Sequence, residues 1–233
     1  MSLVETGWLE KNLERVKIID CSWHMPQTKR NGFDEYKIQH IPKAIFFDLD
    51  FNSKKDIKLP HMLVDINNWK EIVSKMGIKK NDEIIIYDNS DVSSACRCWF
   101  NFIYFGHNPK LVHVLNGGLK KWIVEKKKVT THLPNFEVSN YKCHEKKKLV
   151  KNKYLIDQNI NAQKFKVIDA RSKERFEGKV QEPRNGLRSG NIKNSFCIPF
   201  NECLNENKTF KNKEELRNIF KSCLENINEK NIV

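Results

Sequence analysis

The chain has 233 residues, and its hydrophobic share of 39% is enough for a buried core, which excludes a wholly disordered protein. Its longest apolar runs, such as 84–86, are too short to span a bilayer, and the N-terminus lacks the apolar core of a secretory signal. The formal charge is +13, but 34 of the 42 basic residues are lysines spread along the whole length. Such a spread favours a solvated surface, so a nucleic-acid-binding function ranks last.

The seven cysteines, an odd number at irregular spacing, do not form the pattern of a disulfide framework. They favour a reducing compartment, either the cytoplasm or another one such as the mitochondrial matrix. Cys96 and Cys98 form a C-x-C with no second pair nearby, which argues against a zinc site. We expect these two cysteines to lie partly buried on a helix.

Two similar α/β patterns follow each other along the chain. The β-rich runs 16–20 and 165–169 each end in an aspartate, and the similar blocks 40–47 and 191–198 follow them. Each copy then has an amphipathic helix, at about 68–76 and 213–224, and a new strand, at 84–88 and from 232. Strands that alternate with helices predict an α/β fold in which a parallel sheet is flanked by helices, here in two tandem copies.

The first copy continues further than the second. A helix is predicted at 95–105, a strand at 111–115 and a closing helix at 119–127. The polar, basic segment 136–152 is interpreted as a linker, which gives an N-terminal domain at 1–135 and an incomplete C-terminal domain at 153–233. In parallel sheets ligands bind at the carboxyl ends of strands. Asp88 occupies that position in the first copy, and its counterpart would fall beyond Val233.

Half of the chain's eight arginines lie within 18 residues. They are Arg171, Arg175, Arg184 and Arg188. In a lysine-rich chain this choice indicates a need for planar, bidentate donors, which fit carboxylate, sulfonate or phosphate groups. Structural ion pairs with Glu174, Glu177 and Glu182 explain the same cluster equally well.

Several longer strings resemble the motifs of one family. In the second half they run from Asp169-Ala170-Arg171-Ser172 through Glu182-Pro183-Arg184 to Gly190. In the first half they are His40-Ile41-Pro42, Phe46-Phe47-Asp48-Leu49-Asp50, Pro60-His61-Met62-Leu63 and Leu115-Asn116-Gly117-Gly118-Leu119. In this order, and over about residues 8–233, they are similar to the tandem-domain rhodaneses, the thiosulfate and 3-mercaptopyruvate sulfurtransferases.

The resemblance implies two rhodanese domains with the active site between them, the N-terminal one being a non-catalytic copy. A cysteine of the second domain takes a sulfane sulfur from 3-mercaptopyruvate or thiosulfate as a persulfide, and passes it to a thiol or cyanide acceptor. The expected partners are these small molecules, and the family allows a thioredoxin-like reductant beside them. No cofactor, metal or membrane is expected.

The resemblance also assigns roles to four residues. Arg175 and Arg184 match the arginines that hold the substrate carboxylate, and Arg184 favours 3-mercaptopyruvate over thiosulfate. Asp50 and His61 match auxiliary catalytic positions beside the catalytic cysteine, where they assist proton movement or orientation. Without the resemblance, Asp50 would be interpreted as a turn or helix cap and His61 as a surface turn residue.

Departures from the family pattern bear on the site. The second domain has Asn191-Ile192-Lys193-Asn194-Ser195 where the family has His-Ile-Pro-Gly-Ala, and Cys96 replaces a proline in the first. The cysteine loop Cys-x-x-Gly-x-Thr is absent from the 233 residues. We therefore expect the nucleophile beyond Val233, in a fragment or shortened form of a sulfurtransferase of the 3-mercaptopyruvate type. The alternative is a catalytically inactive, anion-binding or regulatory rhodanese-like module.

Overall fold

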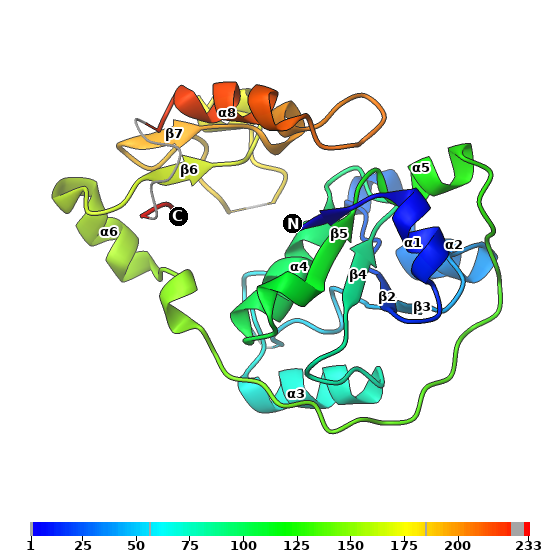
Figure 1. Cartoon of the computed structure of the whole chain (residues 1–233). Coiled ribbons are helices and arrows are strands. Elements are labelled where there is room, and N and C mark those ends of the chain that lie inside the picture. Colours follow the sequence, from blue (N-terminus) through cyan, green and yellow to red (C-terminus); the bar gives the residue numbers. More distant parts are fainter. Residues whose placement is uncertain (1, 56, 185, 225–230) are drawn as a thin grey trace. The chain divides into compact units, whose positions relative to one another are not determined.

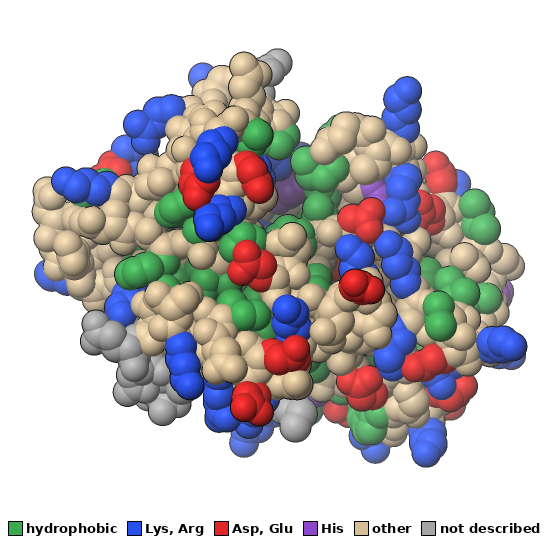
Figure 2. Space-filling model, turned by 90° about the horizontal axis from the view of Figure 1, so that it is seen from above, with side chains coloured by type: hydrophobic (Ala, Val, Ile, Leu, Met, Phe, Trp, Pro, Cys, Tyr) green, Lys and Arg blue, Asp and Glu red, His purple; other side chains and the backbone are tan. Residues whose placement is uncertain are grey.

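The computed structural model describes residues 2–55, 57–184, 186–224 and 231–233. The chain divides into two compact units, Met1–Lys147 and Lys148–Val233, each with its own parallel sheet (Figure 1). On the face seen in Figure 2, lysine and arginine side chains are interspersed with acidic ones. The α/β fold is as the sequence predicted.

Unit 1 contains a five-stranded sheet with the strand order β1-β5-β4-β2-β3 (Figure 1). All neighbouring strands run parallel. The strands are β1 (Leu3–Val4), β2 (Lys17–Asp20), β3 (Ala44–Phe46), β4 (Ile84–Tyr87) and β5 (Val112–Leu115). The central strand β4 is fully buried along its length, as expected for a parallel strand covered on both faces.

Helices cover both faces of this sheet. They are α1 (Thr6–Asn12), α2 (Gly32–Ile38), α3 (Ile66–Lys75), α4 (Ser94–Tyr104) and α5 (Gly118–Val124), with the short 3-10 helices η1 (Pro26–Thr28) and η2 (Pro109–Leu111). Ile84 and Ile86 pack with α3 and α4, whereas Ile85 and Tyr87 pack with α1, α2 and α5. Within the described ranges, no helix is long and apolar enough to cross a membrane.

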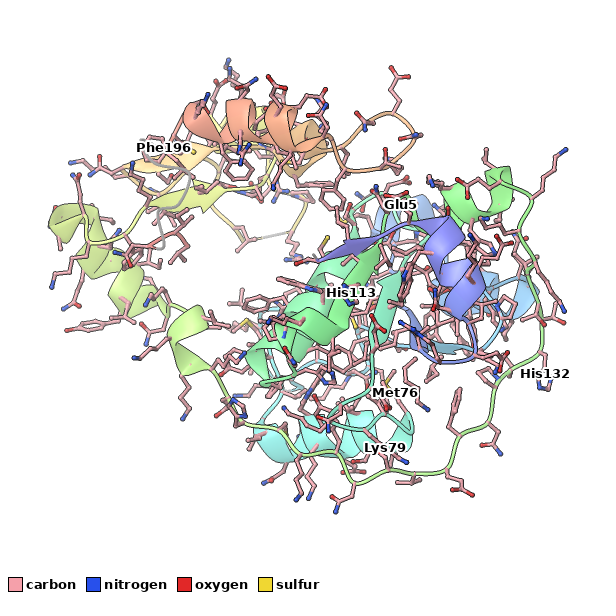
Figure 3. The ribbon with its side chains drawn as sticks, in the orientation of Figure 1. Glu5, Met76, Lys79, His113, His132 and Phe196 are labelled. Atoms are coloured by element: carbon pink, nitrogen blue, oxygen red, sulfur yellow. The ribbon has the colours of Figure 1, made fainter. Side chains whose placement is uncertain are left out.

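The bounds of α3 follow from its capping residue. The Asp65 carboxylate accepts hydrogen bonds from the backbone N–H groups of Asn67 at 2.9 Å and Asn68 at 3.0 Å. Because this cap satisfies two N–H groups that lack helical partners, the helix begins at Ile66, two residues before the predicted start. It ends beside Met76, which is labelled in Figure 3.

Residues 136–147, predicted as part of the linker, belong to unit 1. Tyr141 is completely buried in the core beside α3 and α4. Its hydroxyl lies 2.9 Å from His107 Nδ1, and its backbone N–H donates to Ser74 Oγ at 3.0 Å. The polar composition of the segment concealed the burial of Tyr141, and the boundary between the two compact units lies at residues 147 and 148.

Unit 2 repeats the strand–helix pattern with fewer elements. They are η3 (Lys147–Leu149, at the boundary), α6 (Lys153–Ala162), β6 (Val167–Asp169), α7 (Lys173–Phe176), β7 (Ser195–Cys197), η4 (Phe200–Cys203) and α8 (Lys213–Lys221). β6 and β7 are parallel, and Lys166 forms a parallel bridge to Ile232. This register matches the pairing of Lys17 with Ile84 in unit 1. The predicted duplication is therefore visible in the hydrogen bonding of the two sheets.

Candidate active site

Asp50 and His61, which the family resemblance predicts beside the catalytic cysteine, are in contact with each other. They belong to the segment between β3 and α3, and His61 Nε2 lies 2.7 Å from Asp50 Oδ1. A carboxylate only accepts hydrogen bonds, so Nε2 carries the proton and donates, which leaves Nδ1 of a neutral ring as an acceptor. The Asp50 side chain is 67% exposed and that of His61 only 17%. The arrangement resembles the acid–histidine half of a catalytic triad.

Trp23 is a site residue that the sequence reasoning missed. Its indole Nε1 donates to Asp50 Oδ2 at 2.8 Å, and its ring meets the His61 ring edge-on at a centroid distance of 4.8 Å. Trp23 follows the end of β2, close to the carboxyl edge of the sheet. That position was the available signal, because a large polar-tipped aromatic after a strand end is a common site residue.

Arg97 of α4 contacts the turn that contains His61. Its guanidinium donates to the carbonyl oxygen of His61, whose backbone has a left-handed φ of 57°. Burial lowers the pKa of Arg97 from its ordinary value. A half-buried arginine that donates to a carbonyl in a strained turn holds that turn, and with it the direction of the His61 ring.

Backbone amides at the loop after β4 bind the carboxylate of Asp88, which belongs to the same loop. The Asp88 carboxylate accepts hydrogen bonds from the backbone N–H of Ala95 at 2.7 Å and of Ser90 at 3.0 Å. These amides belong to the loop and to the start of α4, the kind of place where parallel α/β proteins bind anionic ligands. Burial raises the pKa of Asp88, and hydrogen bonds from the two amides oppose that rise. In unit 1 these backbone amides are therefore bound to a carboxylate of the protein itself.

Two of the four clustered arginines of unit 2 are paired with acids. Arg171 Nε contacts both carboxylate oxygens of Asp169, at 3.0 and 2.9 Å, and its NH1 donates to Glu182 at 2.7 Å. Arg175 also donates to Glu182, through both Nε and NH2. The Glu182 side chain is only 3% exposed, and hydrogen bonding to Arg175 lowers its pKa despite the opposing effect of burial. The structural interpretation thus holds for these two arginines, with Glu182 as their common partner.

Arg184 and Arg188 differ from these two arginines. Both are exposed, and among the described residues neither forms an ion pair or a side-chain hydrogen bond. Of the other two predicted partners, Glu177 pairs with Lys179 at 2.6 Å instead of with an arginine. Arg184 lies two residues after Glu182, and its planar guanidinium has no acidic partner within the described ranges, whereas Arg171 and Arg175 share Glu182.

No cysteine in the chain has the environment of a sulfur-carrying nucleophile. All seven are free thiols. Burial raises the pKa of Cys21, Cys96, Cys143, Cys197 and Cys203. The other two, on α4 and just after α8, are buried. A reactive thiol needs both a lowered pKa and access to solvent, and none of the seven is shown to combine the two.

Cys96 and Cys98 lie on α4, as predicted. Cys96 is partly buried, whereas Cys98 is completely buried against the sheet. Across the described ranges, no group of three or more histidine, cysteine or acidic side chains is placed to hold a metal ion.

Comparisons with known proteins agree with this fold. The family described as rhodanese-like domain matches residues 5–125. Thiosulfate/3-mercaptopyruvate sulfurtransferase 1, mitochondrial, of Arabidopsis thaliana is 35% identical and covers 94% of this chain. The 3-mercaptopyruvate sulfurtransferase of Mus musculus is 32% identical over the same share. The crystal structure of SseA from Escherichia coli, a 3-mercaptopyruvate sulfotransferase of rhodanese fold, superposes with a TM-score of 0.85 at 27% identity, covering 95% of this chain and 83% of SseA.

The chain therefore belongs to the rhodanese family, as its motifs predicted, and the relatives named above are sulfurtransferases. It spans 63% of the length of the Arabidopsis protein and 76% of that of the mouse protein.

Proposed function

We propose that this chain serves a sulfurtransferase that moves a sulfane sulfur from 3-mercaptopyruvate, or thiosulfate, to a thiol or cyanide acceptor through a cysteine persulfide. The observation that carries the proposal is the exposed guanidinium of Arg184, which has no acidic partner among the described residues, two residues after the Glu182 that Arg171 and Arg175 share. A planar, uncompensated cation in a segment with further arginines suits a small carboxylate. The relatives supply the chemical class, because their names specify these two donors.

In this proposal Arg184 holds the carboxylate of 3-mercaptopyruvate together with Arg175, whose guanidinium also donates to Glu182. A thiolate attacks the sulfur of the donor, the carbon–sulfur bond breaks with its electron pair moving to carbon, and pyruvate forms after protonation. The sulfur remains as a persulfide until an acceptor thiol or cyanide removes it. His61, whose Nε2–H is bound to Asp50, has Nδ1 available to accept or return a proton during these steps.

We further propose that the persulfide-forming cysteine is none of these seven cysteines, since five of them have raised pKa values, which oppose thiolate formation, and the other two are buried. The rhodanese domains of unit 1 and unit 2 then have different roles. Unit 1, where Asp88 fills the loop after β4, is the non-catalytic copy. A reducing compartment and a thioredoxin-like reductant are consistent with seven free thiols.

Donor binding to the purified chain tests the role of Arg184. We expect saturable binding of 3-mercaptopyruvate by calorimetric titration, and a loss of about tenfold in affinity for Arg184→Ala, the size expected for one charge-assisted hydrogen-bonding partner. The control is Arg217→Ala, which removes an exposed arginine on α8 and should leave affinity unchanged. Equal affinities of the wild-type chain and Arg184→Ala would contradict the proposal.

A second candidate, a catalytically inactive anion-binding module, is favoured by the same raised thiol pKa values. A chimera separates the two functions: this chain followed by the part of the mouse relative that lies beyond their match. A sulfurtransferase predicts turnover of 3-mercaptopyruvate that Arg184→Ala reduces and Arg217→Ala does not. A folded chimera that binds the donor but transfers no sulfur would favour the module.

A further inference from the structure

One side chain contacts both members of the Asp50–His61 pair. The indole N–H of Trp23 donates to Asp50 Oδ2 at 2.8 Å, while the other oxygen of that carboxylate, Oδ1, faces His61 Nε2 at 2.7 Å. The ring of Trp23 stands nearly perpendicular to the His61 ring, at an interplanar angle of 86°. Each carboxylate oxygen therefore has its own donor, and the histidine has an aromatic wall.

The backbone of Trp23 is itself held by hydrogen bonds with two serines. Its backbone N–H donates to Ser94 Oγ at 3.2 Å, and its carbonyl oxygen accepts a hydrogen bond from Ser90 Oγ. Ser94 Oγ in turn donates to the carbonyl of Cys21 at 2.6 Å. These serines belong to the loop after β4 and to the first turn of α4. These hydrogen bonds link the backbone of Trp23 to the loop after β4 and to the first turn of α4.

The carboxylate needs this support because of where it lies. Asp50 is in a turn and its side chain is 67% exposed, so water competes for both oxygens and the terminal torsion rotates easily. A directed N–H on Oδ2 selects the rotamer that presents Oδ1 to His61. The ring orientation and the Nε2–H tautomer of His61 then follow, since the tautomer of a histidine is set by the hydrogen bond of its other nitrogen.

We propose that Trp23 is a positioning residue: through its indole N–H it orients Asp50, and through Asp50 it holds His61 in the Nε2–H tautomer with Nδ1 free. The consequence for sulfur transfer rests on the proposed function, but the geometry and its test do not. Trp23 acts through its neighbours and needs no contact with the substrate.

Substitution by phenylalanine separates this role from simple packing. Trp23→Phe keeps an aromatic ring against His61 and removes only the N–H donor. The matched control is Trp99→Phe, because the Trp99 indole also donates a hydrogen bond, to the carbonyl of Val112 at 3.1 Å, but lies outside the site. Asp50→Asn is the second variant, because it replaces one acceptor oxygen and the negative charge with a neutral NH2 group and leaves the indole donor in place.

The readout is the ¹⁵N chemical shifts of the two His61 ring nitrogens in the full chain, recorded in alkaline buffer where histidine is neutral. We expect the Nε2–H tautomer to dominate in the wild type and in Trp99→Phe. In Trp23→Phe and in Asp50→Asn the two tautomers should approach the mixture of a free imidazole. A wild-type tautomer ratio in a folded Trp23→Phe chain would overturn the proposal.

Titration of the chain and its variants with 3-mercaptopyruvate distinguishes a failure of the positioning role of Trp23 from a failure of the proposed function. If the chain binds no 3-mercaptopyruvate, the proposed function fails while the tautomer result still decides the role of Trp23. If Trp23→Phe leaves the tautomer unchanged while Arg184→Ala weakens donor binding, the positioning role fails and the proposed function stands.

Discussion

The two units share one pattern of strands and helices, but they bury their apolar side chains to different extents. The sheet of unit 1 has a large apolar cluster on each face. In unit 2 the described core is a single cluster of Ile198, Cys223 and Leu224 with a few half-buried neighbours. Ile19 in β2 is completely buried, whereas its counterpart Ile168 in β6 is only partly buried. Strand and turn sequences thus define the pattern, but stability depends on how much apolar surface the surrounding elements cover.

The same comparison applies to the aspartate that ends the first strand of each unit. Asp20 in unit 1 is buried and accepts hydrogen bonds from Ser22, yet burial raises its pKa to about 6. Asp169 in unit 2 is also partly desolvated, but hydrogen bonds from Arg171 lower its pKa below the ordinary value. Deep burial in unit 1 outweighs the hydrogen bonds from Ser22, whereas in unit 2 hydrogen bonds from Arg171 outweigh a partial burial, so the pKa shifts at equivalent positions are opposite.

The largest expected difference between the units concerns their cores. Trp69 of unit 1 is completely buried, so Trp69→Ala should reduce the free energy of unfolding by about 3–5 kcal/mol. Phe196 of unit 2, labelled beside β7 in Figure 3, is 37% exposed, and Phe196→Ala should cost about 1 kcal/mol or less. Urea unfolding, followed by signals of β2 and β6 separately, measures both. Equal losses would show that unit 2 buries as much surface as unit 1.

A smaller effect concerns pH and has opposite signs in the two units. The folded-state pKa of Asp20 is raised, so its contribution is full below the unfolded value of about 4 and is lost as pH rises through about 6. Asp20→Asn should therefore gain about 2 kcal/mol relative to the wild type between pH 4 and pH 7. The pKa of Asp169 is lowered, so its contribution is present at neutral pH and is lost as pH falls.

The matched variant for this prediction is Asp169→Asn, which should destabilise unit 2 at neutral pH and have little effect in acid. Unfolding free energies at the two pH values, for both variants and the wild type, test the contrast. The same direction of change in both units would contradict it.

Much of the fold could be predicted from the sequence because it depends on local patterns. The buried run Ile84–Tyr87 and the capped helix after Asp65 were found within two residues of their true bounds. The position of Tyr141 could not be predicted, because the apolar residues of this polar segment show no periodicity and the burial of Tyr141 depends on elements distant in the sequence.

The site was predictable to the extent that it repeats family motifs. Asp50 and His61 were named from such motifs, and they are in contact. Trp23 was not, because its role comes from a hydrogen bond across 27 residues that no spacing rule encodes. The division of the arginines likewise depended on geometry, since only the structure shows that Glu182 faces Arg171 and Arg175, and that Arg184 has no acidic partner among the described residues.

The central claim is that these 233 residues recognise the sulfur donor without carrying its sulfur. Intact-protein mass spectrometry after incubation with 3-mercaptopyruvate tests it most directly. We predict an unchanged mass under conditions in which calorimetry shows the donor bound. A gain of one sulfur atom, removed by a thiol reductant and mapped to one of the seven cysteines, would contradict the account.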